Sequence, residues 1–449
     1  MLMANRPQVH IETFGCQMNE YDTELIRSLL KAGGFSFTED RERADVVLMN
    51  TCAIRENAHQ KVYGHLGELR VIRRQRNLVV GVLGCMAQNL KKDLLEAEPL
   101  VDVLAGPDSY RELPKLLTEA LRSREEGLSG KGIALDLSEY ETYGDIAPDR
   151  REGVNGWIAV MRGCDNFCAF CVVPYTRGRE RSREPQGIIE EAEQLAAAGY
   201  KQITLLGQNV NSYHHGDWDF ARLLTAVAGV PGIERVRFAS PHPKDFPPAL
   251  LDAVASHPRI CKHIHLPLQA GNDRILAMMN RTYSRKEYLE LVEAIRRRRA
   301  DIVLTTDIIC GFCSETEEEF QDTYRLVQDV GYHSAFIFKY SERKNTIAAR
   351  KYPDDVPDRI KSDRVSRLVG LQKRISLEKN RDMIGRTVEV LVEGDAKRST
   401  KQWMGRTDGS ITVVWPKGAT DPAREPGALR PISITHVSAT TLFGETAPS

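Results

Sequence analysis

The chain has 449 residues, of which 41% are hydrophobic, and its 62 Lys and Arg residues balance 62 Asp and Glu residues. This length and composition predict two to three domains with enough apolar residues for substantial hydrophobic cores. The net charge of zero excludes a chain that is basic throughout, so any nucleic acid has to be met by local basic patches.

Targeting signals and disulfides are not expected. The sequence has no apolar run of about 18 residues that would span a membrane. The N-terminal residues lack the apolar centre of a signal peptide. Nine cysteines, an odd number in a long chain without an export signal, favour ligands and buried thiols over disulfides. We therefore expect a cytoplasmic protein.

Three short apolar runs near the N-terminus each end just before a cysteine. The runs are residues 9–14, 46–50 and 78–83, and the cysteines are Cys16, Cys52 and Cys85. Helical stretches over about residues 21–32 and 54–74 separate the runs, which predicts a parallel sheet with helices on its faces. The carboxyl ends of parallel strands lie along one edge, so the three cysteines are expected to converge there. The alternative is three small buried side chains, since a free cysteine often serves only to fill a core.

The rest of the chain divides by composition and pattern. We predict an α/β domain over residues 1–125, a polar linker over 126–152, a second α/β domain over 153–383 and a small β domain over 384–449. The second domain has six predicted strands, most of them followed by a helix, which indicates an open, partial (β/α)6 barrel with its active site at the carboxyl ends of the strands. Its predicted strands are residues 157–161, 202–206, 235–239, 263–266, 302–306 and 335–339.

The most specific motif follows the first predicted barrel strand. Cys164, Cys168 and Cys171 form a Cys-x3-Cys-x2-Cys loop with no fourth cysteine at ligand spacing. Four protein ligands close the coordination of a metal, whereas three ligands on a four-iron cluster leave one iron open. A zinc knuckle would need a nearby fourth Cys or His, and the next, His214, lies far downstream.

These motifs together resemble the radical S-adenosylmethionine (SAM) methylthiotransferases over nearly the whole chain. The loop from Cys164 to Cys171, with aromatic Phe170 before its last cysteine, is similar to the cluster loop of radical-SAM enzymes. The residues around Cys16, Cys52 and Cys85 resemble the three signatures of the family's N-terminal domain. The segment 206–213 resembles the members that act on tRNA, and the tail resembles the TRAM domain, a small RNA-binding β-barrel.

The resemblance implies a function and its cofactors. Cys16, Cys52 and Cys85 would hold one 4Fe-4S cluster, and the Cys164 loop would hold a second whose open iron binds SAM. One SAM would methylate a sulfur on the first cluster, and another would be cleaved to a 5′-deoxyadenosyl radical. That radical would remove hydrogen from carbon 2 of an isopentenyl-modified adenosine beside the tRNA anticodon, where the methylthio group is then added. An unactivated carbon–hydrogen bond is beyond ordinary acid–base residues, so the cofactors must carry the chemistry.

Other residues are assigned by their place relative to these motifs. Several segments that follow barrel strands look like SAM-facing loops, although tight turns need similar residues. The cofactor-binding candidates are Phe170, Gly207, Gln208, Asn209, Ser240, His242 and Gln269. The arginines that alternate after the cluster loop are candidates for RNA phosphates. They are Arg177, Arg179, Arg181 and Arg183.

The sequence departs from the family pattern in two places, at Cys310 and Cys313 and at Lys344-Asn345, and three rival functions stay open. The family has other residues in the segment that contains Cys310 and Cys313. These two cysteines are either a metal-binding pair or buried side chains. The rivals are methylthiolation of threonylcarbamoyl-adenosine in tRNA, methylthiolation of a ribosomal-protein aspartate, and a non-catalytic iron–sulfur RNA sensor. The expected partners are a tRNA anticodon stem-loop, a flavodoxin- or ferredoxin-like reductant and a sulfur or iron–sulfur supply system, with no membrane.

Overall fold

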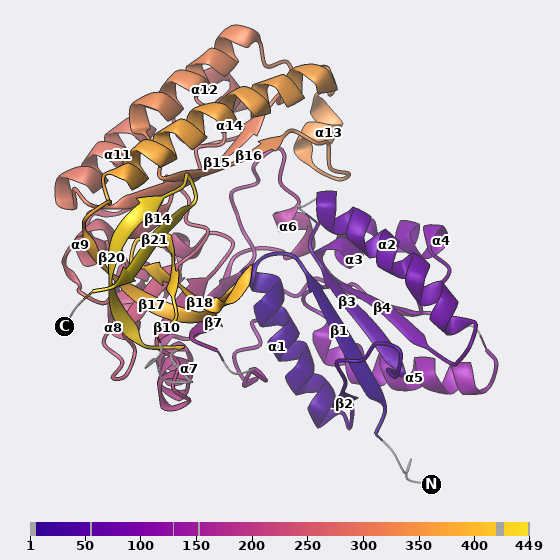
Figure 1. Ribbon diagram of the computed structural model, residues 1–449. Coiled ribbons are helices and arrows are strands. Elements are labelled where there is room, and N and C mark those ends of the chain that lie inside the picture. The colour runs from indigo at the N-terminus through magenta and orange to yellow at the C-terminus, as the bar shows by residue number, and fades with distance from the viewer. Residues whose placement is uncertain (1–5, 54–55, 129, 151–152, 419–425, 448–449) are drawn as a thin grey trace.

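The computed structural model describes residues 6–53, 56–128, 130–150, 153–418 and 426–447. The start of the helix predicted from residue 54 and the last two residues of the predicted linker lie outside these ranges. Three units follow one another along the chain, coloured from indigo to yellow in Figure 1. They are a parallel-sheet α/β unit, a half-open barrel and a closed β-barrel, which confirms the predicted fold class.

The first unit is a six-stranded parallel sheet in the order β2-β1-β3-β4-β5-β6. Its strands are β1 (Gln8–Phe14), β2 (Ser36–Phe37), β3 (Val46–Thr51), β4 (Val79–Gly84), β5 (Val103–Ala105) and β6 (Gly132–Ala134). Its helices are α1 (Gln17–Ala32), α2 (Glu56–Arg73), α3 (Cys85–Leu90), α4 (Lys92–Ala97) and α5 (Leu113–Glu125). Because β3 and β4 are buried on both faces, they read as continuous apolar runs in the sequence.

The predicted linker is more ordered than its composition suggested. Strand β6 comes from it and extends the sheet beside β5. Tyr143, also in this segment, is fully buried and its hydroxyl donates to the carbonyl of Pro107 at 3.1 Å. A strand of only three residues carries too little periodicity to be recognised in the sequence, so tertiary packing decides it.

The second unit has six parallel strands in two groups, in the orders β13-β10-β7 and β14-β15-β16. The strands are β7 (Asn155–Ala159), β10 (Gln202–Leu206), β13 (Arg235–Phe238), β14 (His263–His265), β15 (Val303–Cys310) and β16 (Ser334–Lys339). The covering helices are α7 (Pro185–Ala197), α8 (Phe220–Ala228), α9 (Pro248–Ser256), α10 (Asp273–Met278), α11 (Arg285–Arg298), α12 (Glu317–Val330), α13 (Ile347–Lys351) and α14 (Asp358–Arg381). Short pieces near the loops are β8 (Met161–Arg162), α6 (Val173–Thr176), β9 (Arg181–Ser182), β11 (His214–His215) and β12 (Trp218–Asp219).

The third unit is a closed five-stranded barrel in the order β17-β18-β19-β21-β20. Its strands are β17 (Thr387–Ala396), β18 (Ser399–Thr407), β19 (Thr412–Pro416), β20 (Leu429–Val437) and β21 (Thr441–Thr446). Trp403, Trp415 and aliphatic side chains fill its core. The last two strands have mixed polar sequences, so closure of the barrel was not evident from the pattern.

The half-barrel lies between the other two units, and opposite ends of its strands meet them (Figure 1). Ala159 and Leu206, at the carboxyl ends of β7 and β10, share an apolar core with the first unit. At the opposite ends, Arg235, the first residue of β13, donates to the carbonyl of Arg406 in the third unit at 2.7 Å. The carboxyl edge of the barrel, where the cysteine loop lies, therefore faces the first unit.

Candidate active site between the two α/β units

The N-terminal cysteines meet at one edge of the first sheet. Cys16, Cys52 and Cys85 follow the adjacent strands β1, β3 and β4. The hydrogen bond with Cys52, helped by the charge of Arg177, lowers the pKa of the Cys16 thiol to about 6, although burial opposes this. These cysteines, predicted to converge from far apart in the chain, thus form a half-buried to buried group with one acidic thiol.

Local geometry explains the glycine before Cys85. Gly84 has a φ of 85° and turns the chain from β4 directly into α3. A Cβ atom at this position would lie 2.6 Å from Oδ1 of Asn50 and 2.7 Å from the carbonyl oxygen of Thr51. Only glycine accommodates this turn, which brings Cys85 back beside the strand that leads to Cys52.

The second cysteine set lies in the loop after β8. Gly163 has a φ of 80°, and a Cβ atom there would lie 1.9 Å from the carbonyl oxygen of Arg179. Donors face all three sulfurs: Nδ2 of Asn166 is 3.5 Å from Cys164 Sγ, the Val173 amide is 3.5 Å from Cys171 Sγ, and Nη1 of Arg281 is 3.1 Å from Cys168 Sγ. Hydrogen-bond donors around sulfur favour the thiolate, which is the form that binds iron.

The donor sets fit iron–sulfur clusters better than single metal ions. Among the described residues, no three Cys, His, Asp or Glu side chains lie close enough together to hold one ion. Ligands around a cage of four irons are spread more widely than those around one tetrahedral ion. Burial raises the pKa of Cys164 to about 11, so metal binding would have to displace its proton. Nη1 of Arg177 and Oδ1 of Asn166 are buried without a partner among the described residues, which leaves polar atoms for a bound group to meet.

The predicted SAM-facing residues gather around the cysteine loop. Oε1 of Gln208 accepts from the amide of Gly163 at 2.7 Å, so the segment after β10 contacts the loop directly. Asn209 is buried and donates to Glu180 and Asp245 at 3.2 and 3.0 Å. Oδ1 of Asn209 has no partner within the described parts of the chain.

Three further candidates have unusual backbone or electrostatic settings. Ser240 and Gln269 have φ values of 60° and 67°, in the left-handed region that non-glycine residues seldom adopt. Burial and the nearby Arg281 lower the pKa of His242 to about 2, so this ring is neutral and packs against Tyr283. A Cβ atom at Gly207 would lie 2.7 Å from Cγ of Met161, and Phe170 packs against the barrel core. The roles of Gly207 and Phe170 in binding SAM stay predictions.

The structure corrects the predicted RNA contacts of the alternating arginines. Arg177, Arg181 and Arg183 are buried, where they pair with Asp22, Asp108 and Glu191 at 2.7, 2.9 and 2.7 Å. Buried and neutralised guanidinium groups are not available to phosphates. Arg179 alone is exposed, at 68% of its side chain, and lies over the ring of Phe167.

Some site residues were not visible in the sequence. Arg281 lies in the turn after α10 and Asp22 within α1, and no motif or spacing marks either one. Asp22 is fully buried and bonds Arg162 and Arg177 at 2.6 and 2.7 Å. Only its position on the buried face of an amphipathic helix, where a carboxylate needs a partner, could have drawn attention to it.

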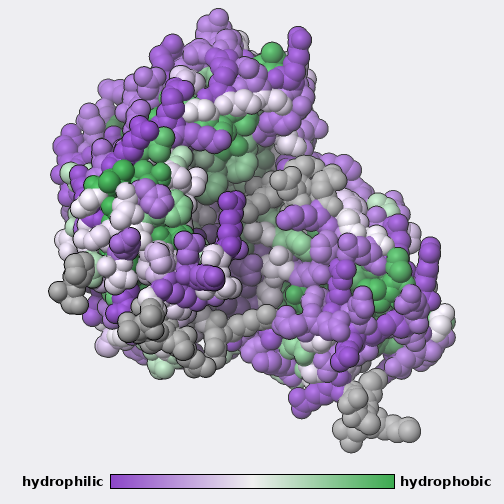
Figure 2. All heavy atoms as spheres, viewed as in Figure 1, coloured by the Kyte–Doolittle hydropathy of each residue, from purple (hydrophilic) through white to green (hydrophobic). Residues whose placement is uncertain are grey.

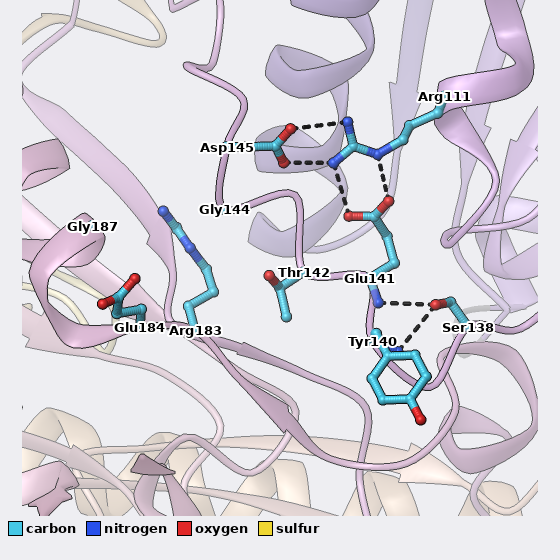
Figure 3. A pocket seen from close by; sticks show the side chains of 10 residues that line it. All are labelled: Arg111, Ser138, Tyr140, Glu141, Thr142, Gly144, Asp145, Arg183, Glu184 and Gly187. Carbon is cyan, nitrogen blue, oxygen red and sulfur yellow. Dashed lines mark hydrogen bonds and ion pairs between the residues drawn. The ribbon is translucent and has the colours of Figure 1, made fainter. Parts of the chain in front are cut away.

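A cavity of about 480 Å³ lies away from the two cysteine sets, between residues 138–145 of the predicted linker and the start of α7. Figure 3 shows its lining, with Arg111 held between Glu141 and Asp145. Because its arginine is neutralised and none of the six cysteines lines it, we do not assign the chemistry to this cavity.

Three stretches of the chain match known protein families. Residues 8–106 match the uncharacterized protein family UPF0004, residues 158–327 the radical SAM superfamily and residues 381–447 the TRAM domain. The TsrM methyltransferase of Kitasatospora setae, solved with cobalamin and a [4Fe-4S] cluster, shares the fold with a TM-score of 0.56 at 16% identity. The similarity covers 77% of this chain and 74% of that one.

Two curated relatives are similar over almost the whole chain. The tRNA-2-methylthio-N(6)-dimethylallyladenosine synthase of Porphyromonas gingivalis is 46% identical, covering 98% of this chain and 94% of that protein. The same enzyme of Chloroherpeton thalassium is 45% identical, covering 98% and 96%. The resemblance found in the sequence is confirmed, and the chain belongs to the family of radical-SAM tRNA-2-methylthio-N(6)-dimethylallyladenosine synthases.

Proposed function

We propose that the protein adds a methylthio group to carbon 2 of dimethylallyl-adenosine beside the anticodon of tRNA. The observation that carries this proposal is the meeting of two three-cysteine sets across one buried interface, with Nε of Arg177, from the second unit, 3.1 Å from Sγ of Cys85 in the first. The family's cofactors are 4Fe-4S clusters and SAM. When bound, a cluster with an open iron supplies reductive cleavage of SAM, and a second cluster supplies the site of the sulfur.

The chain's own residues hold and shield these groups. Cys164, Cys168 and Cys171 would bind the SAM-cleaving cluster, with Arg281 donating to Cys168. Cys16, Cys52 and Cys85 would bind the sulfur-carrying cluster. Gln208 fixes the backbone of the cysteine loop through Gly163, and the first unit covers this end of the barrel.

The experiment is anaerobic incubation of the iron-loaded protein with SAM, reductant and tRNA that carries dimethylallyl-adenosine, read by nucleoside mass spectrometry. We expect methylthio-dimethylallyl-adenosine to appear. The same tRNA without the dimethylallyl group, tRNA with threonylcarbamoyl-adenosine and a ribosomal protein are the parallel substrates. The proposal would be contradicted if product formed only from one of these parallel substrates. It would also be contradicted if SAM stayed uncleaved with every substrate.

Partners and location are part of the proposal. The third unit belongs to the RNA-binding TRAM domains and supports tRNA as the substrate. A flavodoxin- or ferredoxin-like reductant and a sulfur supply system would deliver electrons and sulfur. None of the described helices is long and apolar enough to span a membrane. We place the reaction in the cytoplasm because tRNA is modified there.

Two exposed aromatics are candidates for contacts with the RNA. Phe336 and Phe338 of β16 are 56% and 46% exposed, whereas their neighbours Ala335 and Ile337 pack into the core. Strand alternation therefore turns both rings to the face of the barrel opposite its helices. Figure 2 shows hydrophobic side chains on the barrel side of a hollow between the two α/β units. Unstacked RNA bases commonly stack on such rings.

We expect Phe336→Ala and Phe338→Ala each to raise the KM for tRNA about tenfold, since stacking of one base contributes about 1–3 kcal/mol. SAM cleavage without tRNA should not change. The matched control is Tyr140→Ala, which removes a ring that is 86% exposed in the cavity of Figure 3. Equal effects of all three changes in steady-state assays would argue against a base site on β16.

Cys310 and Cys313 are predicted to be spare thiols. Both are buried, and the Cys313 thiol contacts the hydroxyl of Tyr340. We expect the double change to Ala to leave iron content and product formation largely intact, because two complete ligand sets exist without this pair. Iron analysis after reconstitution checks this, and loss of about a third of the iron would identify a third site.

A further inference from the structure

Arg177 belongs to the second unit but its side chain ends in the first. It follows the short helix α6, six residues after Cys171, and its side chain is 3% exposed. Nε donates to Sγ of Cys85 at 3.1 Å. One cysteine set thus receives a charged hydrogen bond from the loop that carries the other set.

Asp22 fixes this guanidinium in place. Its Oδ2 accepts from Nη2 of Arg177 at 2.7 Å, and its Oδ1 accepts from Nη2 of Arg162 at 2.6 Å. Arg162 immediately precedes Gly163 and Cys164 in the chain, and the hydroxyl of Tyr110 donates to the same carboxylate at 3.3 Å. A single buried carboxylate of α1 therefore anchors both ends of the Cys164 loop to the first unit.

A comparable arginine serves the other set from within its own unit. Nη1 of Arg281 is 3.1 Å from Sγ of Cys168, and its Nε donates to the hydroxyl of Tyr283 at 3.0 Å. Each set thus has one buried arginine on one sulfur. The difference is that Arg281 stays with its cysteine when the units separate, whereas Arg177 does not.

We propose that Arg177 is a positioning residue that holds Cys85 and raises the reduction potential of the cluster at Cys16, Cys52 and Cys85. It does so only while the first and second units are packed together. This inference rests on the proposed function. A cationic donor on a ligand sulfur stabilises the reduced, more negative state and raises the potential. Arginine suits the role because its planar fork binds a carboxylate and a sulfur together, which a lysine ammonium cannot match in geometry.

The test uses the full chain with Cys164, Cys168 and Cys171 changed to Ala, loaded anaerobically with iron and sulfide. In this parent, a redox titration followed by electron paramagnetic resonance reports only the N-terminal cluster. We expect Arg177→Met to shift its midpoint to a more negative potential and Arg281→Met to leave it unchanged. In the reverse parent, with Cys16, Cys52 and Cys85 changed to Ala, Arg281→Met should lower the midpoint and Arg177→Met should not.

Each other outcome has a defined meaning. An unchanged midpoint in the iron-loaded Arg177→Met chain, or equal shifts from the two arginine changes, overturns the inference alone. A parent that binds no iron at Cys16, Cys52 and Cys85 overturns the proposed function and the inference with it. If Arg177→Met does not fold, Arg177→Gln is the second variant, because it removes the positive charge and keeps a polar side chain. A midpoint in Arg177→Gln equal to that of the parent then overturns the inference.

Discussion

Replacing Cys164, Cys168 or Cys171 by Ala is expected to reduce 5′-deoxyadenosine formation from SAM to background under anaerobic, reducing conditions. Within the described parts of the chain, the set has three thiols and no fourth ligand to replace a lost one. Asn166, Arg281 and the Val173 amide contact its sulfurs. Chromatography of the reaction mixture measures the product. Normal 5′-deoxyadenosine formation in any single variant would mean that the loop does not bind SAM's cluster.

The triple variant of Cys16, Cys52 and Cys85 separates the two sets. It should lose about half of the iron and all methylthio-adenosine, yet still form 5′-deoxyadenosine. The physical reason is that Arg177 loses only its bond to Cys85 and keeps its ion pair with Asp22, so the Cys164 loop stays anchored. Cys261→Ala is the matched control, because this buried thiol belongs to neither set and should retain full iron and product. A triple variant with full methylthiolation would refute the donor role.

Asp22→Asn is expected to destabilise the interface by about 3–5 kcal/mol, because two buried guanidinium groups lose their shared counter-charge. Both arginines and Asp22 are almost completely inaccessible to water, so solvent cannot compensate. Hydrogen exchange of α1, read by mass spectrometry, should be faster in the variant by a factor of about 150 to 5,000, which corresponds to this loss of stability.

Glu290→Gln is the matched control for this stability change. It removes an exposed carboxylate of α11 that lies 3.7 Å from Lys286. Exposed pairs of this kind contribute at most about 1 kcal/mol, so α1 should exchange as in the unchanged protein. If Asp22→Asn also leaves exchange of α1 unchanged, the carboxylate does not hold the two units together.

The sequence by itself determined the chemistry and most of the architecture. The Cys-x3-Cys-x2-Cys loop is local, so its three sulfurs are close in any fold. The convergence of Cys16, Cys52 and Cys85 followed from strand periodicity, because adjacent parallel strands end at one edge. The strand and helix series predicted the partial barrel for the same reason, since buried strands and amphipathic helices have distinct apolar periods.

Only the tertiary structure decided how the units fit together. Arg177, Arg181 and Arg183 alternate like side chains on a surface, and their carboxylate partners lie from 8 to 155 positions away in the chain. Strand β6 and the buried ring of Tyr143 likewise depend on tertiary contacts, which cannot be predicted from the sequence of a polar segment. Whether a charge meets water or a buried partner is set by packing between distant segments, which local sequence patterns do not encode.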